Sequence, residues 1–599
     1  MPRFVGPTPP SVRFWLRLCC SVGQAILPAA GILAGLVQAI LKIMKRRSVA
    51  SACGVLLALG CAVIALPGSS PRSPIFFALK SLPFRLENAE TESRHLPATM
   101  AGGVAVFDFN KDGRPDIFFT NGANLATLKK DDVKFYNRLF RNDGNGTFTD
   151  VTSQSGLVGT GYDMGVAVGD FDNDGYPDLF VAGVHHNTLY HNNGDGTFTD
   201  VTVKAGLNRP DSEYGPHWAV TAAWVDVNND GLLDLFVVNY VRWNYENEPK
   251  CWHEALSEYC NPRSYQGLPN ELYLNKGDGT FEDVSEKWGI RSHIGKGMGI
   301  GVADYDRDGR PDIFIANDTF YTFLFHNLGT KFEEVAFPAG VALPEDGNFI
   351  GGMGADFRDF DNDGLPDIAY VALSKQTFPL LKNLNGREFR EVTAETGLRA
   401  LTLPMAAFGA AFYDFDNDGW KDLFVTRGDA VSHNLPGTIV DQPNTVFRNP
   451  GPGGKWQALT EEAGLQAAGP ARNRGCAFGD LDGDGRVDVV ATALSKPAQI
   501  WMNRSEGTGR WLDIALEGTK SNRDGIGAVV KVTTKSGIQY NHMTTSFCYA
   551  SSSDGPVHFG LGADDKALSV EIRWPSGIVQ NLQNVAADRV IQAKEPSPH

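Results

Sequence analysis

One nine-residue pattern recurs seven times in this chain of 599 residues: Asp, any residue, Asp or Asn, any residue, Asp, Gly, two residues, Asp. Oxygen-bearing side chains at positions one, three, five and nine, a glycine turn at position six and the backbone carbonyl of position seven can enclose one hard cation. Such an irregular oxygen cage suits Ca²⁺ better than Mg²⁺. The pattern therefore predicts seven calcium-binding loops.

The predicted metal ligands are the residues at positions one, three, five, seven and nine of each copy. They are Asp108, Asn110, Asp112, Arg114, Asp116, Asp170, Asp172, Asp174, Tyr176, Asp178, Asp226, Asn228, Asp230, Leu232, Asp234, Asp304, Asp306, Asp308, Arg310, Asp312, Asp359, Asp361, Asp363, Leu365, Asp367, Asp414, Asp416, Asp418, Trp420, Asp422, Asp480, Asp482, Asp484, Arg486 and Asp488. Because the pattern singles out no one copy, we expect about seven structural calcium ions, with no catalytic residue and no other cofactor.

The pattern has two other possible interpretations, ordinary turns and a helix–loop–helix calcium hand. Asp, Asn and Gly also mark ordinary turns, although seven complete copies make that explanation weak. A helix–loop–helix calcium hand needs a Glu at position twelve and helical flanks. Position twelve is instead Phe119, Val181, Val237, Ile315, Tyr370, Val425 and Ala491. The flanks, such as VAVFD before the first loop and PDIFFT after it, alternate like strands, so each loop is expected to join two strands.

The spacing of the loops predicts the architecture. Successive copies are separated by 62, 56, 78, 55, 55 and 66 residues, which is the scale of one propeller blade. After each loop comes a second motif, an apolar pair followed by Asn and a glycine-rich turn, as in LFRNDGNGTFTDVT from Leu139. Two hairpins per repeat give four strands, and seven such sheets close into a ring with short edges. We predict an all-β fold, a seven-bladed β-propeller with calcium-binding hairpin loops.

The repeats resemble the FG-GAP or VCBS repeats of integrin α-subunits, whose propellers hold calcium in hairpin loops of this form. The segments SNRDGIGAVVKV (521–532), HFGLG (558–562) and VEIRWPSG (570–577) resemble the ASPIC/UnbV domain. The combination is similar to the cartilage acidic protein family and its bacterial relatives. This resemblance implies a propeller at 83–508 followed by a small β-rich, sandwich-like domain at 509–595, and it supplies no established reaction.

Two apolar segments precede the repeats. Residues 44–73 combine the basic start and apolar run of a secretory signal with a linker rich in Pro, Gly and Ser. Residues 25–43 are long enough to span a membrane. We expect residues 1–43 to be either an untranslated extension ahead of Met44 or a membrane anchor. Both alternatives export the propeller to the periplasm, the cell surface or the medium. A lipid on Cys61 is disfavoured because the apolar run AVIAL follows it.

The charge of the chain fits cation binding. The formal net charge is −16, and the seven motifs hold 26 carboxylates. Since an apo chain would hold these like charges close together, we expect metal binding and folding to be coupled. No Lys/Arg cluster with interleaved aromatic residues follows the N-terminal segments, so nucleic acid is not an expected partner. We expect a monomer.

An insertion at 242–269 makes the interval between the third and fourth loops the longest. In an exported protein its Cys251 and Cys260 are expected to form a disulfide, the alternative being two unpaired thiols. Cys476 has the pattern of a small buried residue and Cys548 belongs to the C-terminal domain, so no redox role is inferred for either. The aromatic residues of the insertion, Trp243, Tyr245, Trp252 and Tyr265, predict a binding surface, unless they only pack the insertion onto the propeller.

The sequence leaves two functional classes open. His185, His186, His191 and His217 suggest acid–base or metal chemistry, but no HExxH, nucleophile elbow, phosphate loop or zinc-spaced set accompanies them. The favoured hypothesis is not an enzyme but an exported, calcium-stabilised binding or adhesion scaffold that contacts protein or glycan through propeller loops and the C-terminal domain. The alternative is a carbohydrate-active enzyme, similar to a polysaccharide lyase, with a funnel of basic and aromatic residues in the propeller's mouth.

The count of expected strands that follow the calcium loops leaves one strand surplus, and this strand predicts how the ring closes. RWLDIAL (510–516) opens the C-terminal domain in the family resemblance, which leaves the seventh blade with strands near 475–480, 488–493 and 499–503. The segment PFRLENA (83–89) is then free to supply its fourth strand. We predict that this pairing of distant segments closes the ring without an open seam.

Overall fold

The computed structural model describes residues 74–597 except 209–210, 434–435 and 554. The segments 1–43 and 44–73, predicted as extension or anchor and as signal and linker, lie outside the described residues. These described residues form one compact unit. Within the described ranges, every helix is too short or too polar to cross a bilayer.

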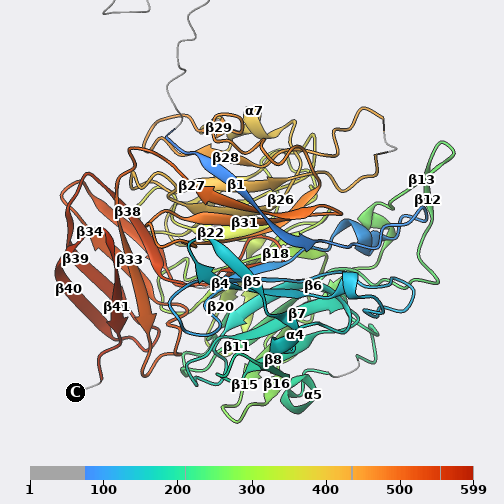
Figure 1. Ribbon diagram of the computed structural model, residues 1–599, viewed down its shortest axis with the longest axis horizontal. Helices are drawn as coiled ribbons and strands as arrows, with labels where there is room; N and C mark the ends of the chain where they lie inside the picture. Colours follow the sequence, from blue (N-terminus) through green and yellow to red (C-terminus); the bar gives the residue numbers. More distant parts are fainter. Residues whose placement is uncertain (1–73, 209–210, 434–435, 554, 598–599) are drawn as a thin grey trace, which may run out of the picture. The chain divides into compact units, whose positions relative to one another are not determined.

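Seven sheets of four propeller strands form the bulk of the molecule, which confirms the all-β propeller prediction (Figure 1). The sheets are blade 1, β2 (Val104–Phe107), β3 (Asp116–Phe119), β4 (Arg138–Gly144) and β5 (Thr147–Asp150); blade 2, β6 (Tyr162–Gly169), β7 (Asp178–Val184), β8 (Thr188–Asn192) and β9 (Phe198–Asp200); blade 3, β10 (Ala219–Val225), β11 (Asp234–Asn239), β15 (Glu271–Asn275) and β16 (Phe281–Asp283); blade 4, β18 (Gly297–Ala303), β19 (Asp312–Asn317), β20 (Phe323–Asn327) and β21 (Phe332–Glu334); blade 5, β22 (Ala355–Arg358), β23 (Asp367–Tyr370), β24 (Leu380–Asn383) and β25 (Phe389–Glu391); blade 6, β26 (Ala407–Tyr413), β27 (Asp422–Arg427), β28 (Thr445–Arg448) and β29 (Gln457–Leu459); and blade 7, β30 (Asn473–Gly479), β31 (Asp488–Ala493), β32 (Pro497–Asn503) and β1 (Phe77–Arg85).

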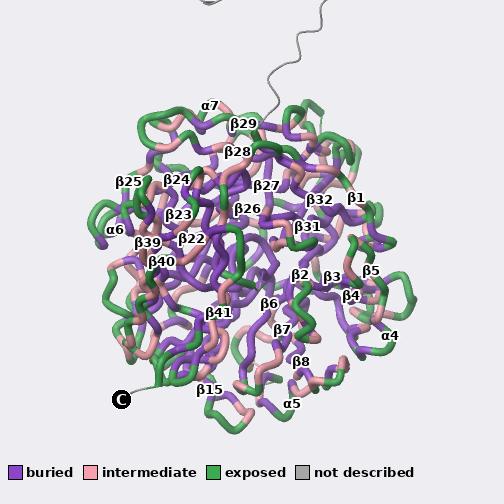
Figure 2. The backbone as a smooth tube through the Cα atoms, turned by 60° about the vertical axis from the view of Figure 1, so that its left-hand side comes forward, coloured by how far each residue is buried: buried purple, intermediate pink, exposed green. Residues whose placement is uncertain are grey.

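The innermost strands form a closed cycle. The first strand of each blade contacts the first strand of the next, from β2 through β6, β10, β18, β22 and β26 to β30, which contacts β2 again. These strands are buried on both faces and carry small residues where blades approach closely, as in YDMGVAVG of β6. In several outer strands one buried aromatic residue is followed by more exposed polar ones, as in FTD of β9 and FED of β16. Figure 2 shows this gradient from the buried centre to the exposed rim.

The N-terminal strand closes the ring as predicted, although its bounds differ. β1 runs antiparallel to β32 in the seventh blade, with Phe77 opposite Asn503 and Leu79 opposite Trp501. The predicted segment 83–89 falls at the end of this strand, beyond a register shift between Ser81 and Arg85. Pro83 lies in this bulge, where its missing N–H breaks no ladder bond.

The C-terminal residues form two packed sheets, which agrees with the sandwich-like domain expected from the family resemblance. One sheet contains β38 (Val557–Gly562), β33 (Arg510–Glu517) and β41 (Arg589–Lys594), and the other contains β35 (Ile538–His542), β34 (Val529–Thr533), β39 (Lys566–Arg573) and β40 (Val579–Ala586). Their shared core, which includes Leu512 and Ile572, continues into blades 2 and 3 through residues such as Trp224. The propeller and the C-terminal sheets are therefore packed as one body.

A hairpin from the C-terminal residues fills the propeller's central channel. Its strands β36 (Ser546–Phe547) and β37 (Ser551–Ser553) extend the sheet of blade 1, because β37 pairs in parallel with β2. All residues from 543 to 553, which we call the channel plug, are buried. The plug also contacts the inner strands β6, β18, β22 and β30. Glycines allow this close approach: a Cβ at Gly103 would lie 2.4 Å from the carbonyl oxygen of Ala550.

The insertion at 242–269 lies at the other end of the propeller from the C-terminal sheets (Figure 1). It contains a hairpin of β12 (Cys251–His253) and β13 (Leu256–Glu258), the 3₁₀ turn η3 (Pro262–Ser264) and β14 (Leu268–Pro269), which pairs with β17 (Ile294–Gly295). The remaining short helices are η1 (Leu96–Thr99), η2 (Val133–Phe135), α4 (Thr152–Ser155), α5 (Thr202–Ala205), α6 (Ala336–Ala339) and α7 (Leu398–Thr402).

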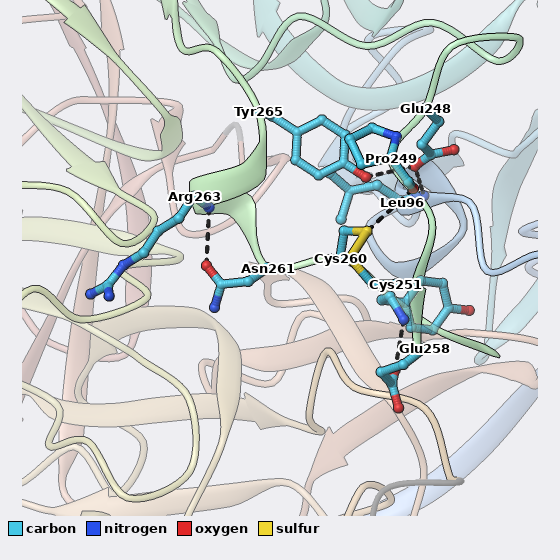
Figure 3. The surroundings of a disulfide bond; sticks show 10 residues. Leu96, Glu248, Pro249, Cys251, Glu258, Cys260, Asn261, Arg263 and Tyr265 are labelled. Carbon is cyan, nitrogen blue, oxygen red and sulfur yellow. Dashed lines mark hydrogen bonds between the residues drawn. A yellow bond between two sulfur atoms is a disulfide. The ribbon is translucent and has the colours of Figure 1, made fainter. Parts of the chain in front are cut away.

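The predicted disulfide between Cys251 and Cys260 is present at the base of the hairpin (Figure 3). Beside it, the Glu248 carboxylate accepts hydrogen bonds from the Leu96 backbone and the Tyr265 hydroxyl, both at 2.8 Å. Glu258 accepts from the backbone and side chain of Ser432 at 2.9 and 2.6 Å. The base of the insertion is therefore fastened to the segment before blade 1 and to blade 6.

We predict that deleting residues 74–95 destabilises blade 7 more than blade 2. The deletion removes β1 and leaves the edge of β32 unpaired, although blade 7 lies far away in the sequence. Hydrogen exchange should rise first in residues 488–503. Uniform exchange across blades 2 and 7, or protection of 488–503 equal to that in the full chain, would contradict this account of ring closure.

Candidate metal centres

The seven aspartate loops share one geometry, with each loop lying between the first and second strands of its blade. In every loop the backbone N–H of the position-six glycine donates to the position-one carboxylate at 2.7–2.9 Å. The backbone N–H of position seven donates to the position-five carboxylate at 2.8–3.0 Å. The glycines have φ between 80° and 98°, a left-handed conformation that other residues rarely adopt. These hydrogen bonds to the aspartate carboxylates stabilise the conformation of each loop.

The position-nine aspartates connect each loop to its own second hairpin. One carboxylate oxygen accepts the backbone N–H of position two at 2.9–3.2 Å. The other accepts the backbone N–H of the Asn in the second motif at 2.6–2.8 Å. These Asn residues are Asn142, Asn192, Asn275, Asn327, Asn383, Asn449 and Asn503, and we call them the hairpin asparagines. The second motif therefore orients the metal loop.

The same asparagines join neighbouring blades. Each side-chain amide donates to the position-two carbonyl of the preceding blade's loop, at 2.7–3.0 Å. The series includes Asn142, which reaches Leu481 in blade 7, so the joints form a complete circle. Each amide also donates to the position-eight carbonyl of its own loop, at 3.0–3.3 Å. The sequence showed that this Asn recurs but gave no sign of its partner in the preceding repeat.

Burial makes the loop carboxylates costly to ionise without a cation. Burial raises the pKa of Asp116, Asp170 and Asp414 to about 8, and neighbouring carboxylates contribute to the rise. For Asp178 the pKa rises to about 7 from the same cause. A bound divalent cation or a proton relieves this repulsion, which is the electrostatic behaviour expected of a metal site.

The donor set fits a hard cation. The carboxylates of Asp170, Asp172 and Asp174 offer oxygens within 4.8 Å of one another, and other loops do the same. Asp359 Oδ1, Asp361 Oδ1 and Asp416 Oδ1 are buried and lack a hydrogen-bond donor. Buried polar atoms without a partner are rare in folded proteins. A cation bound by oxygen atoms would satisfy them, so the acidic clusters can hold metal ions.

The residue before each hairpin asparagine makes the loops unequal. In blade 5 the Lys382 ammonium contacts the carboxylates of Asp361 and Asp363, the latter at 3.0 Å. In blade 6 Arg448 contacts Asp416 and Asp418 at 2.8 and 2.6 Å.

In blade 7 Met502 precedes the hairpin asparagine, and the residue after it, Arg504, contacts Asp482 and Asp484 instead. In blades 2 and 4 the residues before the hairpin asparagines are histidines. His191 lies 3.2 Å from Asp178, and His326 lies 3.1 Å from Asp312. The sequence suggested a variable hairpin position here, and the structure shows that it faces the loop carboxylates.

The other histidines named from the sequence do not form a common site. His185 Nε2 donates to the carbonyl of Trp243 at 3.0 Å, and His186 contacts the hydroxyls of Thr160 and Thr188. His217 lies 3.3 Å from Asp211 and 3.3 Å from Glu271. Each has its own local partners.

Comparison with protein families defines the class of the chain. The FG-GAP-like repeat model matches residues 108–181, 170–237, 261–315 and 359–425. The ASPIC and UnbV model matches residues 518–599. The loop at 480–488 lies outside these matches yet has the same hydrogen bonds as the other loops. The chain is an FG-GAP-type propeller followed by an ASPIC/UnbV domain.

Among curated proteins, the chain is similar to cartilage acidic protein 1. The relative from Xenopus tropicalis is 25% identical over 544 residues, covering 87% of this chain and 77% of the relative. The relative from Homo sapiens is 25% identical over 553 residues, covering 88% and 76%. These matches confirm the family resemblance seen in the sequence.

Two solved structures overlap this chain with low TM-scores. An Agrocybe aegerita lectin that recognises non-reducing terminal N-acetylglucosamine has a TM-score of 0.39 and 16% identity, covering 66% of this chain and 87% of the lectin. The exotype rhamnogalacturonan lyase YesX has a TM-score of 0.38 and 14% identity, covering 72% and 76%. With TM-scores below 0.5, these overlaps say nothing about function.

We predict that Asn192→Ala destabilises the protein by about 1–3 kcal/mol, because buried carbonyls on two blades lose their donor. Asn192 donates to Phe109 of blade 1 at 2.9 Å and to Pro177 of its own loop at 3.1 Å. Asn193→Ala is the matched control, since the neighbouring Asn193 is exposed and bonds only within its own turn. Urea unfolding measures both. Equal midpoints for the two variants would show that the joint between blades contributes nothing measurable.

Proposed function

We propose that this protein is an exported, calcium-stabilised scaffold that binds a protein or glycan ligand. The acidic loops support calcium as the cation, because their carboxylate and amide oxygens are the ligands that calcium prefers. The Cys251–Cys260 disulfide supports export, since structural disulfides persist in oxidising compartments. The proposal assigns calcium a structural role and gives no residue a catalytic one.

The observation that carries the binding role is a cleft of about 790 Å³ between the metal loops and the C-terminal sheets. A cleft of this size is typical of ligand sites. The loops of blades 3 and 4 line one side, where Asp230 and Asp308 are exposed. Lys531, Tyr540 and Arg573 line the other side. Propeller loops and C-terminal domain therefore meet where a ligand could contact both.

The charges of the cleft indicate the chemistry of its ligand. The Lys531 ammonium lies over the ring of Tyr540 at 5.7 Å, and the Arg307 guanidinium lies over the same ring at 5.6 Å. With calcium on the loop carboxylates, these basic groups would face a cleft that is no longer strongly acidic. Such a surface suits hydroxyl and carboxylate groups, as on a glycan or an acidic protein segment.

The central channel offers no support for the alternative of a carbohydrate-active enzyme in the propeller's mouth. The funnel of basic and aromatic residues that would favour a lyase is occupied by the channel plug. Arg474 and Tyr549 do lie there, but both are fully buried. The Tyr549 hydroxyl donates to the carbonyl of Met100 at 2.6 Å, and Arg474 donates to the carbonyl of Thr99 at 2.6 Å.

The structure divides the aromatic residues of the insertion. Trp243 and Tyr265 are buried, as the packing alternative expected, whereas the exposed fractions of Trp252 and Tyr245 are 63% and 40%. Trp252 lies on the hairpin and remains a candidate for ligand contact. Replacing the whole segment 246–262 would also remove Glu248 and Glu258, which fasten the insertion, so a single substitution at Trp252 is the sharper test.

We predict that chelation with EDTA lowers the melting temperature and that added calcium restores it. The raised pKa values set the pH dependence of the metal-free protein. A carboxyl whose folded-state pKa lies above its usual value of 3.8 contributes stability at lower pH, and this contribution is lost as the pH rises. For Asp116 and Asp170 the window runs from about pH 4 to about 8. Calcium should therefore stabilise more at pH 8 than at pH 5.

Superimposable melts in EDTA and in excess calcium, together with no metal by elemental analysis, would refute structural calcium. Asp172→Ala should raise hydrogen exchange in blade 2 while the other blades stay protected, because their loops are intact. Asp195→Ala is the matched control, since Asp195 is an exposed aspartate of the same blade that bonds only within its own turn. Magnesium in place of calcium tests the identity of the ion.

We predict that a ligand identified on glycan and protein arrays in the presence of calcium no longer binds the double variant Lys531→Ala and Arg573→Ala. The reason is that both side chains line the cleft. Lys535→Ala is the control, because Lys535 is exposed on the same sheet region and does not line the cleft. Loss with Trp252→Ala instead would place the binding surface on the insertion. Retained binding in all variants would refute both placements.

A further inference from the structure

Two cysteines that are distant in the sequence meet inside the propeller. Cys476 lies on β30 of blade 7, and Cys548 lies on the channel plug, 72 residues later in the chain. Their sulfur atoms are 3.1 Å apart. Both side chains are buried, with exposed fractions of 0% and 1%. In the part of the chain that the structure describes, every cysteine thus has another cysteine beside it, since Cys251 and Cys260 are already bonded.

The backbone holds both cysteines in place. Cys476 pairs with Ala491 in the ladder of blade 7. The Cys548 backbone N–H donates to the carbonyl of Ala355 at 2.7 Å, and the Ala355 N–H donates back to Cys548 at 3.3 Å. Cys548 has a φ of 71°, the left-handed region that glycine adopts at less cost. The ladder pairing of Cys476 and these backbone hydrogen bonds of Cys548 hold the two residues where their sulfur atoms face each other.

A glycine on the neighbouring blade leaves room for the two sulfurs. A Cβ at Gly409, on β26 of blade 6, would lie 2.8 Å from Cys476 Sγ and 2.8 Å from Cys548 Sγ. Both sulfur atoms therefore occupy the space above one residue that has no side chain. The third atom close to this Cβ position is the uncharged hydroxyl oxygen of Thr426, at 2.7 Å.

We propose that Cys476 and Cys548 form a disulfide that fastens the channel plug to blade 7. Because a disulfide has an S–S length of about 2.05 Å, the sulfurs need to approach by roughly 1 Å, which side-chain rotation can supply. In the reaction each thiol loses its proton and one electron, and the S–S bond forms. The two electrons pass to a disulfide oxidant, such as oxidised glutathione or an oxidoreductase disulfide, which is reduced to two thiols.

The position of the pair determines when the bond can form. The oxidant and its mixed-disulfide intermediate need access to a sulfur, and both sulfurs are buried in the folded protein. Formation therefore accompanies insertion of the plug during folding, and the finished bond resists reductants until the channel opens. The proposal depends on export only for the oxidising surroundings that it requires in the cell.

The test maps thiols in the full chain. The protein is refolded with calcium in a buffer of reduced and oxidised glutathione, alkylated in guanidinium, and digested without reduction. Mass spectrometry should find a peptide pair linked through Cys476 and Cys548 beside the pair linked through Cys251 and Cys260. Alkylated Cys476 and Cys548 would overturn the proposal, whatever the state of the other pair.

A second set of measurements separates this bond from export and from packing. The same mapping on protein taken from producing cells tests export, because reduction of both pairs there refutes export while leaving the result of refolding unchanged. Wild-type protein refolded with a reductant should have a lower urea midpoint than the oxidised form. This difference should persist in C251S/C260S, where the Cys251–Cys260 bond no longer contributes, and vanish when C476S/C548S is added to that background. A difference that survives in the variant lacking all four of these cysteines, or its absence from C251S/C260S, would overturn the proposal.

Discussion

The hydrogen bonds of the hairpin asparagines are the interaction on which the rest of the ring depends. Each asparagine backbone N–H donates to the position-nine aspartate, and its side-chain amide donates to a carbonyl in the loop of the preceding blade, as Asn275 does with Asp234 and Phe171. Loop closure, hairpin position and blade-to-blade contact therefore use the same buried groups. Since an unpaired buried carbonyl costs about 1–3 kcal/mol, no blade can shift without affecting its neighbour.

Cation binding is linked to this ring through the loop aspartates. Their pKa values are raised by burial, so the folded protein favours a cation or a proton at each loop. The loops meet this demand differently: Lys382 and Arg448 place positive charge on their loop carboxylates, whereas blade 3 has Leu274 at the corresponding position. A basic side chain competes with a metal ion for the same oxygens, so loops that look equivalent in sequence differ in how strongly they need the ion.

The sequence predicted those features that local spacing determines. The nine-residue loops and the two hairpins per repeat follow from patterns within about 60 residues, and the structure contains both. The surplus strand was predicted from a count of strands together with the family resemblance, since it pairs with residues more than 400 positions away. The channel plug could not be predicted, because SFCYASSS has no periodic apolar face and its partners, such as β2, lie more than 400 residues away. For the same reason the meeting of Cys476 and Cys548 was missed. The bounds of β1 were wrong because Pro83 lies inside a bulge rather than before a strand.

Blade 7 joins the N-terminal strand to the channel plug, which constrains where a ligand can bind. Its outer strand is β1 and its inner strand β30 lies against the plug, so releasing the N-terminal strand weakens the blade that also contacts the plug. The plug fills the channel. Glu248 and Glu258 fasten the base of the insertion at the end of the propeller opposite the C-terminal sheets. A ligand that had to enter the channel would need to break this arrangement. Recognition is therefore better served by surfaces that the ring holds rigid from outside, namely the cleft beside the metal loops and the exposed hairpin that carries Trp252.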